Sequence, residues 1–140
     1  ARARRLGHGT RLVEDPDLLA WVNDFRIPVE VCLASNVQTR AVSALQEHPI
    51  GRYLKAGLRV TLNTDNRLVS DTTVTNEFAL AVEAFGLSLD DVLALILNGF
   101  KAAFLPLAEK RRLVEQTLAE FDALGARFAG EISRRRRVLI

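Results

Sequence analysis

Residues 58–66 read LRVTLNTDN, a β-rich segment that ends in polar residues. This pattern predicts a β-strand over residues 58–63, with the polar residues 64–66 at its carboxyl end. A second strand is predicted over residues 27–33, IPVEVCL, and a short first strand within residues 4–9, RRLGHG. The first half of the chain is therefore expected to contain three strands.

Helical segments separate and follow these strands. Asp15 and Pro16 together favour a helix start, because Asp is a good N-cap and Pro suits the first helical position. Residues 34–36 are expected to form a loop, and residues 49–55 a second helix. Three further helices are predicted: over residues 74–85, from a capping-box-like start at Ser88 to a stop at Pro106, and over residues 108–124.

Alternation of strands and helices favours a parallel sheet, because the helix between two strands carries the chain back over the sheet. Three parallel strands are few for a free-standing α/β domain, since their edges would expose unpaired backbone groups. A (β/α)₈ barrel takes about 250 residues, and this chain has 140. The predicted fold class is therefore α/β, and the chain is expected to be a C-terminal piece of something larger, of which a barrel of this kind is one example.

Composition narrows the function classes. The chain is 49% hydrophobic and 26% charged, which is typical of a globular protein. No apolar run approaches the length of a membrane helix, and no secretory signal opens the chain, so we expect no membrane partner. A single cysteine, Cys32, excludes an internal disulfide and fits a reducing compartment, from which a cytoplasmic location is expected.

The basic character of the chain is concentrated at its end. The net charge is +2, but four of the 19 Lys and Arg residues form the run 134–137. Without residues 134–140, 15 basic residues face 17 acidic ones, and only 6% of the chain is aromatic. These values argue against a nucleic-acid partner. A terminal arginine run is usually a solvated end, and the alternative is a module that binds polyanions.

Polar residues follow each predicted strand, where parallel α/β folds gather their functional groups. These residues are His8 after the first strand, Ser35 and Asn36 after the second, and Asp65 and Asn66 after the third. His8 has glycine on both sides, which would bring the backbone close and leave the imidazole uncrowded.

Each candidate also has a purely structural interpretation. His8 could lie in a surface turn, Asp65 could cap the next helix, and Asn66 could be a turn residue. His48 is interpreted as a helix-start residue without a catalytic role, and Cys32 as a core residue. The chain has no Gly-x-Ser-x-Gly elbow, phosphate-binding loop or His-Glu-x-x-His helix.

Four segments together resemble the C-terminal half of the adenosine deaminase family of metal-dependent amidohydrolases. They are RLGHGT at residues 5–10, LASNVQT at 33–39, TLNTDN at 61–66 and NGFKAAFLP at 98–106. The resemblance covers roughly residues 4–124. It implies that the three strands are the sixth to eighth of the barrel, that residues 1–126 form its C-terminal part, and that residues 127–140 are a basic tail.

The resemblance also implies a chemistry. His8 would lie beside the water that zinc activates, and Asp65 would be both a zinc ligand and an acceptor for that water. The implied reaction is the zinc-dependent hydrolytic deamination of adenosine and 2′-deoxyadenosine to inosine and 2′-deoxyinosine, a step of purine salvage. Asn66 stands where the family usually has a second aspartate that binds purine N7, and its amide can donate the same hydrogen bond. The segment at 33–36 lacks the proline that the family usually has there.

The resemblance places the other zinc ligands, a His-x-His and a further His, and the catalytic glutamate upstream of residue 1. Asp65 alone cannot hold a catalytic zinc, which needs about three protein ligands. The 140 residues alone are therefore expected to be inactive without the N-terminal part of the barrel, in the same polypeptide or a second chain. The alternatives are a deaminase of adenine or another 6-aminopurine nucleoside, and a non-catalytic truncated relic.

Overall fold

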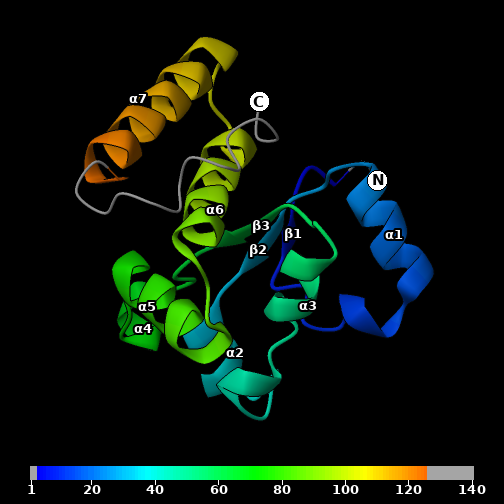
Figure 1. The fold of residues 1–140 in the computed structure, drawn as a ribbon. Coiled ribbons are helices and arrows are strands. Elements are labelled where there is room, and N and C mark those ends of the chain that lie inside the picture. Colours follow the sequence, from blue (N-terminus) through cyan, green and yellow to red (C-terminus); the bar gives the residue numbers. More distant parts are fainter. Residues whose placement is uncertain (1–2, 126–140) are drawn as a thin grey trace. The chain divides into compact units, whose positions relative to one another are not determined.

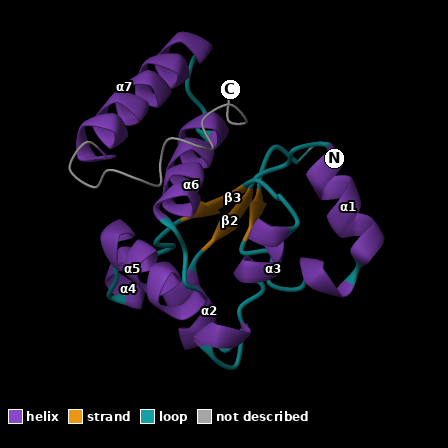
Figure 2. Cartoon of the chain, in the orientation of Figure 1, coloured by secondary structure: helices purple, strands orange, loops and turns teal. Residues whose placement is uncertain are grey.

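The computed structural model describes residues 3–125. The chain divides into two compact units, Ala1–Gly86 and Leu87–Ile140. The first unit contains a parallel sheet of β1 (Leu6–Gly7), β2 (Val29–Val31) and β3 (Val60–Leu62), in that order. Figure 2 shows the three strands side by side. The predicted parallel sheet is confirmed, and its strands are shorter than expected.

The order β1-β2-β3 places consecutive strands next to each other without a reversal. Leu6 pairs with Val29, and Val29 pairs with Val60. A sheet that grows in one direction is the arrangement of a (β/α)₈ barrel. A doubly wound sheet instead reverses its strand order at a switch point. The topology therefore fits part of a barrel.

Helices fill the connections between the strands and also follow β3 (Figure 1). In the first unit they are the 3₁₀ turns η1 (Leu12–Glu14) and η2 (Leu45–Glu47), and the helices α1 (Pro16–Asp24), α2 (Leu33–Gln38), α3 (Ile50–Lys55), α4 (Arg67–Ser70) and α5 (Val74–Phe85). The second unit contains α6 (Leu89–Ala102) and α7 (Leu107–Gly125), which pack against each other. The basic tail predicted at 127–140 lies outside the described residues.

Several helix boundaries follow the signals in the sequence. The Asp15 side chain accepts a hydrogen bond from the Leu18 N–H at the start of α1. Ser88 and Asp91 form a reciprocal capping box at the start of α6. Helix α5 ends at Gly86, which has a left-handed φ of 63°. These ends are determined by local hydrogen bonds and backbone conformation, so short sequence patterns predict them.

The expected loop at residues 34–36 is wrong, because these residues lie in the first half of α2. The carboxylate of Glu77, on α5, accepts hydrogen bonds from the N–H groups of Leu33 (2.7 Å) and Ala34 (3.3 Å). These two N–H groups open the helix and have no partner within it. A residue more than forty positions away therefore completes this helix start.

The core of the first unit is built from the sheet and the helices that contact it. Val29, Val31 and Val60 are fully buried, as are Ile50 and Tyr53 of α3. Both α3 and α5 contact β3. Packing of these elements holds the strand ends that carry the polar candidates.

No helix within residues 3–125 is both long enough and apolar enough to span a membrane.

Candidate functional site

His8 follows β1 and is held at the end of the sheet. Its N–H donates to the Glu30 carbonyl (2.8 Å), so pairing with β2 continues to this residue. Its φ is 59°, in the left-handed region that non-glycine residues seldom adopt. The backbone therefore turns sharply at His8, and the side chain is exposed at the carboxyl end of the strand.

The turn after His8 depends on Gly9. A Cβ at this position would lie 2.6 Å from Cγ1 of Val29, and its φ is +57°. The Tyr53 hydroxyl donates to the Gly9 carbonyl (2.6 Å) and accepts from the Val13 N–H (3.0 Å). Gly7, by contrast, has open space where a Cβ would lie. Of the two glycines that flank His8, only Gly9 is therefore required, because its backbone lies close to the Val29 side chain.

Asp65 lies just beyond β3 and also has a left-handed φ, of 49°. The Ser35 hydroxyl donates to its Oδ2 at 2.6 Å. This hydrogen bond is the main cause that lowers the pKa of Asp65 below its ordinary value, and the loss of some hydration acts against it. Ser35 therefore orients Asp65 and favours its ionised form.

The first turns of α2 connect the two strand ends. Asn36 Nδ2 lies 2.9 Å from Nδ1 of His8, and Ser35 contacts Asp65. Both Ser35 and Asn36 are buried. The structure thus brings together the polar groups of all three strand ends that the sequence singled out.

Asn66 has a structural role that the sequence suggested only in general terms. Its Oδ1 accepts hydrogen bonds from the N–H groups of Leu68 and Val69, both at 3.1 Å, and caps α4. The helix cap is therefore Asn66, whereas the structural interpretation of Asp65 as the cap is wrong. Because the cap uses the amide oxygen, the Asn66 NH₂ group keeps its capacity to donate elsewhere.

His48, which the sequence analysis interpreted as a helix-start residue, is also a neighbour of the site. It is 3% exposed, its Nδ1 lies 3.1 Å from the Ile50 N–H, and its Nε2 lies 3.1 Å from Oδ1 of Asn36. Burial lowers the pKa of His48 to about 4, so the ring is neutral at neutral pH. No local motif marks the contact with Asn36, because His48 lies between η2 and α3 and Asn36 lies on α2, twelve positions earlier.

Glu77 is a second buried group that the sequence did not reveal. It is fully buried, and besides the start of α2 it accepts a hydrogen bond from the Thr72 hydroxyl (3.0 Å). In the sequence it is one of several helical glutamates. Its position supports the helix that carries Ser35 and Asn36.

Cys32 is a core residue, as the sequence analysis interpreted it. It is 5% exposed. Burial and the nearby carboxylates of Asp65 and Glu77 raise the pKa of its thiol to about 11. The side chain therefore stays protonated at neutral pH and is a poor nucleophile.

The described residues offer few donors for a metal ion. Within residues 3–125, no three His, Cys, Asp or Glu side chains gather in a group able to hold a metal ion. Asp65 is an oriented carboxylate whose lowered pKa suits a single oxygen ligand of zinc. The described residues can therefore supply one ligand, Asp65, to a metal centre whose other ligands come from elsewhere.

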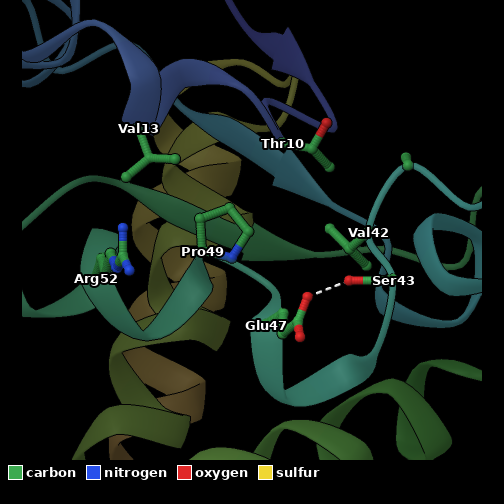
Figure 3. Close-up of a pocket in the computed structure, with 8 residues that line it drawn as sticks. Thr10, Val13, Val42, Ser43, Glu47, Pro49 and Arg52 are labelled. Carbon is green, nitrogen blue, oxygen red and sulfur yellow. Dashed lines mark hydrogen bonds between the residues drawn. The ribbon is translucent and has the colours of Figure 1, made fainter.

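A separate hollow of about 270 Å³ opens beside the loops after β1 and α2 (Figure 3). Its lining includes Thr10, Val42, Glu47 and Arg52, and the Ser43 hydroxyl donates to Glu47. None of His8, Asp65 or Asn66 lines this hollow. It is therefore distinct from the cluster at the strand ends.

Comparison with known proteins places these features in a family. The family model described as adenosine deaminase matches residues 1–120. An adenosine deaminase of Mycobacterium sp. (strain JLS) is 43% identical over 127 residues, which cover 83% of this chain and 35% of that protein.

Two solved structures share the fold. An adenine deaminase from Arthrobacter aurescens has a TM-score of 0.81 at 29% identity, covering 85% of this chain and 36% of its own. An amidohydrolase from Burkhoderia ambifaria with bound Zn has a TM-score of 0.80 at 25% identity, covering 90% and 35%. This chain therefore spans about a third of the length of its relatives, and it belongs to the adenosine deaminase family.

Proposed function

We propose that this chain supplies the sixth to eighth βα units of an adenosine deaminase barrel, and that residues 1–126 form this part. The complete protein adds water to C6 of adenosine or 2′-deoxyadenosine and releases ammonia, which leaves inosine or 2′-deoxyinosine. The observation that carries the proposal is the pair of hydrogen bonds from α2, Ser35 to Asp65 and Asn36 to His8. These bonds orient a carboxylate after β3 and an imidazole after β1, on either side of β2, in a deaminase fold.

Asp65 is the proposed metal ligand of this chain, and one zinc is expected per complete site. Zinc, when bound, supplies the Lewis acidity that lowers the pKa of a water molecule toward 7. The bound Zn of the Burkhoderia relative supports this choice of metal. The remaining ligands and the catalytic glutamate are proposed to come from the part of the barrel that this chain lacks.

His8 and Asp65 have complementary roles in handling the attacking water. His8 is exposed at the end of β1, where its imidazole can donate a hydrogen bond to the water oxygen. Asp65 is held ionised by Ser35 and can accept a hydrogen bond from the same water. Placing a donor and an acceptor around one water aligns it for attack and is a general means of acid–base catalysis.

Asn66 is the proposed purine contact. Its NH₂ group can donate to N7, an acceptor, while its oxygen caps α4. Because the oxygen of the amide is used in the cap, the NH₂ group is the end available to the purine. The likeness to an adenine deaminase keeps a second candidate open, deamination of adenine or of another 6-aminopurine nucleoside. Purine salvage in the cytoplasm is the setting that we propose for either activity.

The test is to measure deamination and zinc content for two variants of the complete protein. His8→Ala is expected to lower kcat by about 10²- to 10⁴-fold while zinc stays bound. Asp65→Ala is expected to lose both activity and zinc. Asp24→Ala, which removes an exposed carboxylate on α1, is the control and should change neither. Activity of His8→Ala within tenfold of the parent, or full zinc in Asp65→Ala, would contradict the assigned roles.

A further inference from the structure

We propose that His48 is a positioning residue that, through Asn36, holds His8 in the tautomer with its proton on Nε2. Three hydrogen bonds connect the groups in series: Ile50 N–H to His48, His48 to Asn36, and Asn36 to His8. We call this series the Ile50–His8 relay. Its importance for catalysis rests on the proposed function, whereas its hydrogen-bond directions do not.

The relay starts from a donor whose direction cannot change. The Ile50 backbone N–H lies 3.1 Å from Nδ1 of His48, and a backbone N–H can only donate. Nδ1 of His48 must therefore be unprotonated. A neutral imidazole carries one N–H, so the proton of His48 is on Nε2.

The second step orients the Asn36 amide. Nε2–H of His48 donates to the atom 3.1 Å away, which must be the amide oxygen. In the reverse orientation, the NH₂ group would face another N–H, and two donors would oppose each other in a buried site. Asn36 is 2% exposed, so water cannot relieve such a conflict.

The third step determines the state of His8. With its oxygen directed at His48, Asn36 turns its NH₂ group to Nδ1 of His8, at 2.9 Å. Nδ1 must then accept, and the neutral ring carries its proton on Nε2. Nε2 is the nitrogen left to face the reacting groups, so His8 offers them a donor. In this tautomer, Nε2 has no lone pair with which to take a proton from water.

This arrangement distinguishes His48 from a residue that merely fills space. A leucine could fill the space but could not orient Asn36, and the Asn36 amide would then be free to bind His8 in either direction. We therefore expect His48→Leu to lower kcat about tenfold or more with little change in KM, as is typical when a supporting hydrogen bond is removed. His48→Gln keeps a side-chain N–H donor and should recover most of that loss.

The direct test is ¹⁵N NMR of histidine in the complete protein. The His8 signals are assigned by their loss in His8→Gln. The expected spectrum shows an unprotonated Nδ1 and a protonated Nε2 on His8. In Asn36→Asp the carboxylate can only accept, so Nδ1 of His8 should gain a proton.

Two results would overturn the proposal: a protonated Nδ1 on His8 in the parent protein, or no change at Nδ1 in Asn36→Asp. Both are read without an activity assay. If His48→Leu does not fold, the spectra of the parent protein and of Asn36→Asp still test the predicted tautomer of His8. If the predicted tautomer is found in a protein that does not deaminate purines, the relay stands and the proposed function fails.

Discussion

Two residues of the candidate site, His8 and Asp65, have left-handed backbone conformations. For a residue with a Cβ this conformation is unfavourable by about 1–2 kcal/mol. The neighbouring hydrogen bonds from Asn36 and Ser35 act on the two side chains. Backbone strain of this kind is common where a side chain must be directed into a site.

Replacement of Gly9 should reveal how tightly the turn after His8 is packed. Gly9→Ala would place a Cβ 2.6 Å from Val29 at a positive φ, and we expect a loss of about 1–3 kcal/mol in the free energy of unfolding. Gly7→Ala is the matched control, because a Cβ there meets nothing within 4 Å. Urea unfolding of the complete protein measures both, and equal destabilisation would refute the role of Gly9.

Burial of His48 predicts a dependence of stability on pH. Its folded pKa of about 4 lies below the ordinary value of 6.5, so the unfolded chain binds the proton first as the pH falls. The stabilising contribution is therefore complete above about pH 6.5 and is lost progressively down to about pH 4. Unfolding of His48→Gln should lack this component, which we expect to be about 1–3 kcal/mol. If the free energy of unfolding changes between pH 7.5 and pH 4.5 by the same amount in His48→Gln as in the parent protein, the assignment to His48 is contradicted.

Helix α2 depends on a residue outside itself. Glu77 of α5 binds the two N–H groups that open the helix, and the helix has no side-chain cap of its own. The orientation of Ser35 and Asn36 therefore depends on the packing of α5. This dependence connects the stability of two elements to the geometry of the site.

Removal of Glu77 should destabilise the protein strongly. Glu77→Ala leaves the Leu33 N–H and the Thr72 hydroxyl without their buried partner, and we expect a loss of about 2–5 kcal/mol. Glu83→Ala, at an exposed position of the same helix, should change the free energy of unfolding by less than about 0.5 kcal/mol. Similar losses in the two variants would show that Glu77 does not support α2.

At the scale of the molecule, the sheet within residues 3–125 is open at both edges. Strands β1 and β3 are the edges of the sheet described for residues 3–125, and each pairs on one side only. The chain also spans about a third of the length of its relatives. An open parallel sheet of this size leaves backbone groups unpaired, which the rest of a barrel would cover.

The purified 140-residue chain should therefore lack stoichiometric zinc and deaminase activity. Asp65 is its proposed ligand, and about three are needed. Addition of a polypeptide that supplies the first five βα units should restore about one zinc and activity. Metal analysis of the same samples provides the measurement. Deamination by the 140-residue chain alone, abolished in Asp65→Ala, would show that no other segment is required.

A polyanion-binding role of the arginine run can be tested separately. Residues 126–140 lie outside the described part of the chain, so this test depends on sequence alone. If the run binds polyanions, affinity for heparin should fall steeply with added salt and disappear when residues 134–140 are removed. Binding that is unaffected by either change would exclude the run as the binding element.

Local signals were sufficient for much of the fold. The helix starts at Asp15 and Ser88 and the stop at Gly86 depend on neighbouring backbone groups, so short patterns predicted them. The alternation of strands and helices predicted a parallel sheet, because the connections leave few other topologies. Strand lengths and the loop at 34–36 were less well predicted, since pairing partners and Glu77 lie far away in sequence.

The sequence by itself determined the family, through the motifs around His8, Asn36 and Asp65, and the order of the elements. Only the tertiary structure decided that Ser35 contacts Asp65 and that His48 reaches His8 through Asn36. Sequence motifs identify which residue types lie at the ends of the strands, and those residue types indicate the chemistry. The partners of a buried polar group depend on which helices pack together, and that information is distributed over the whole fold.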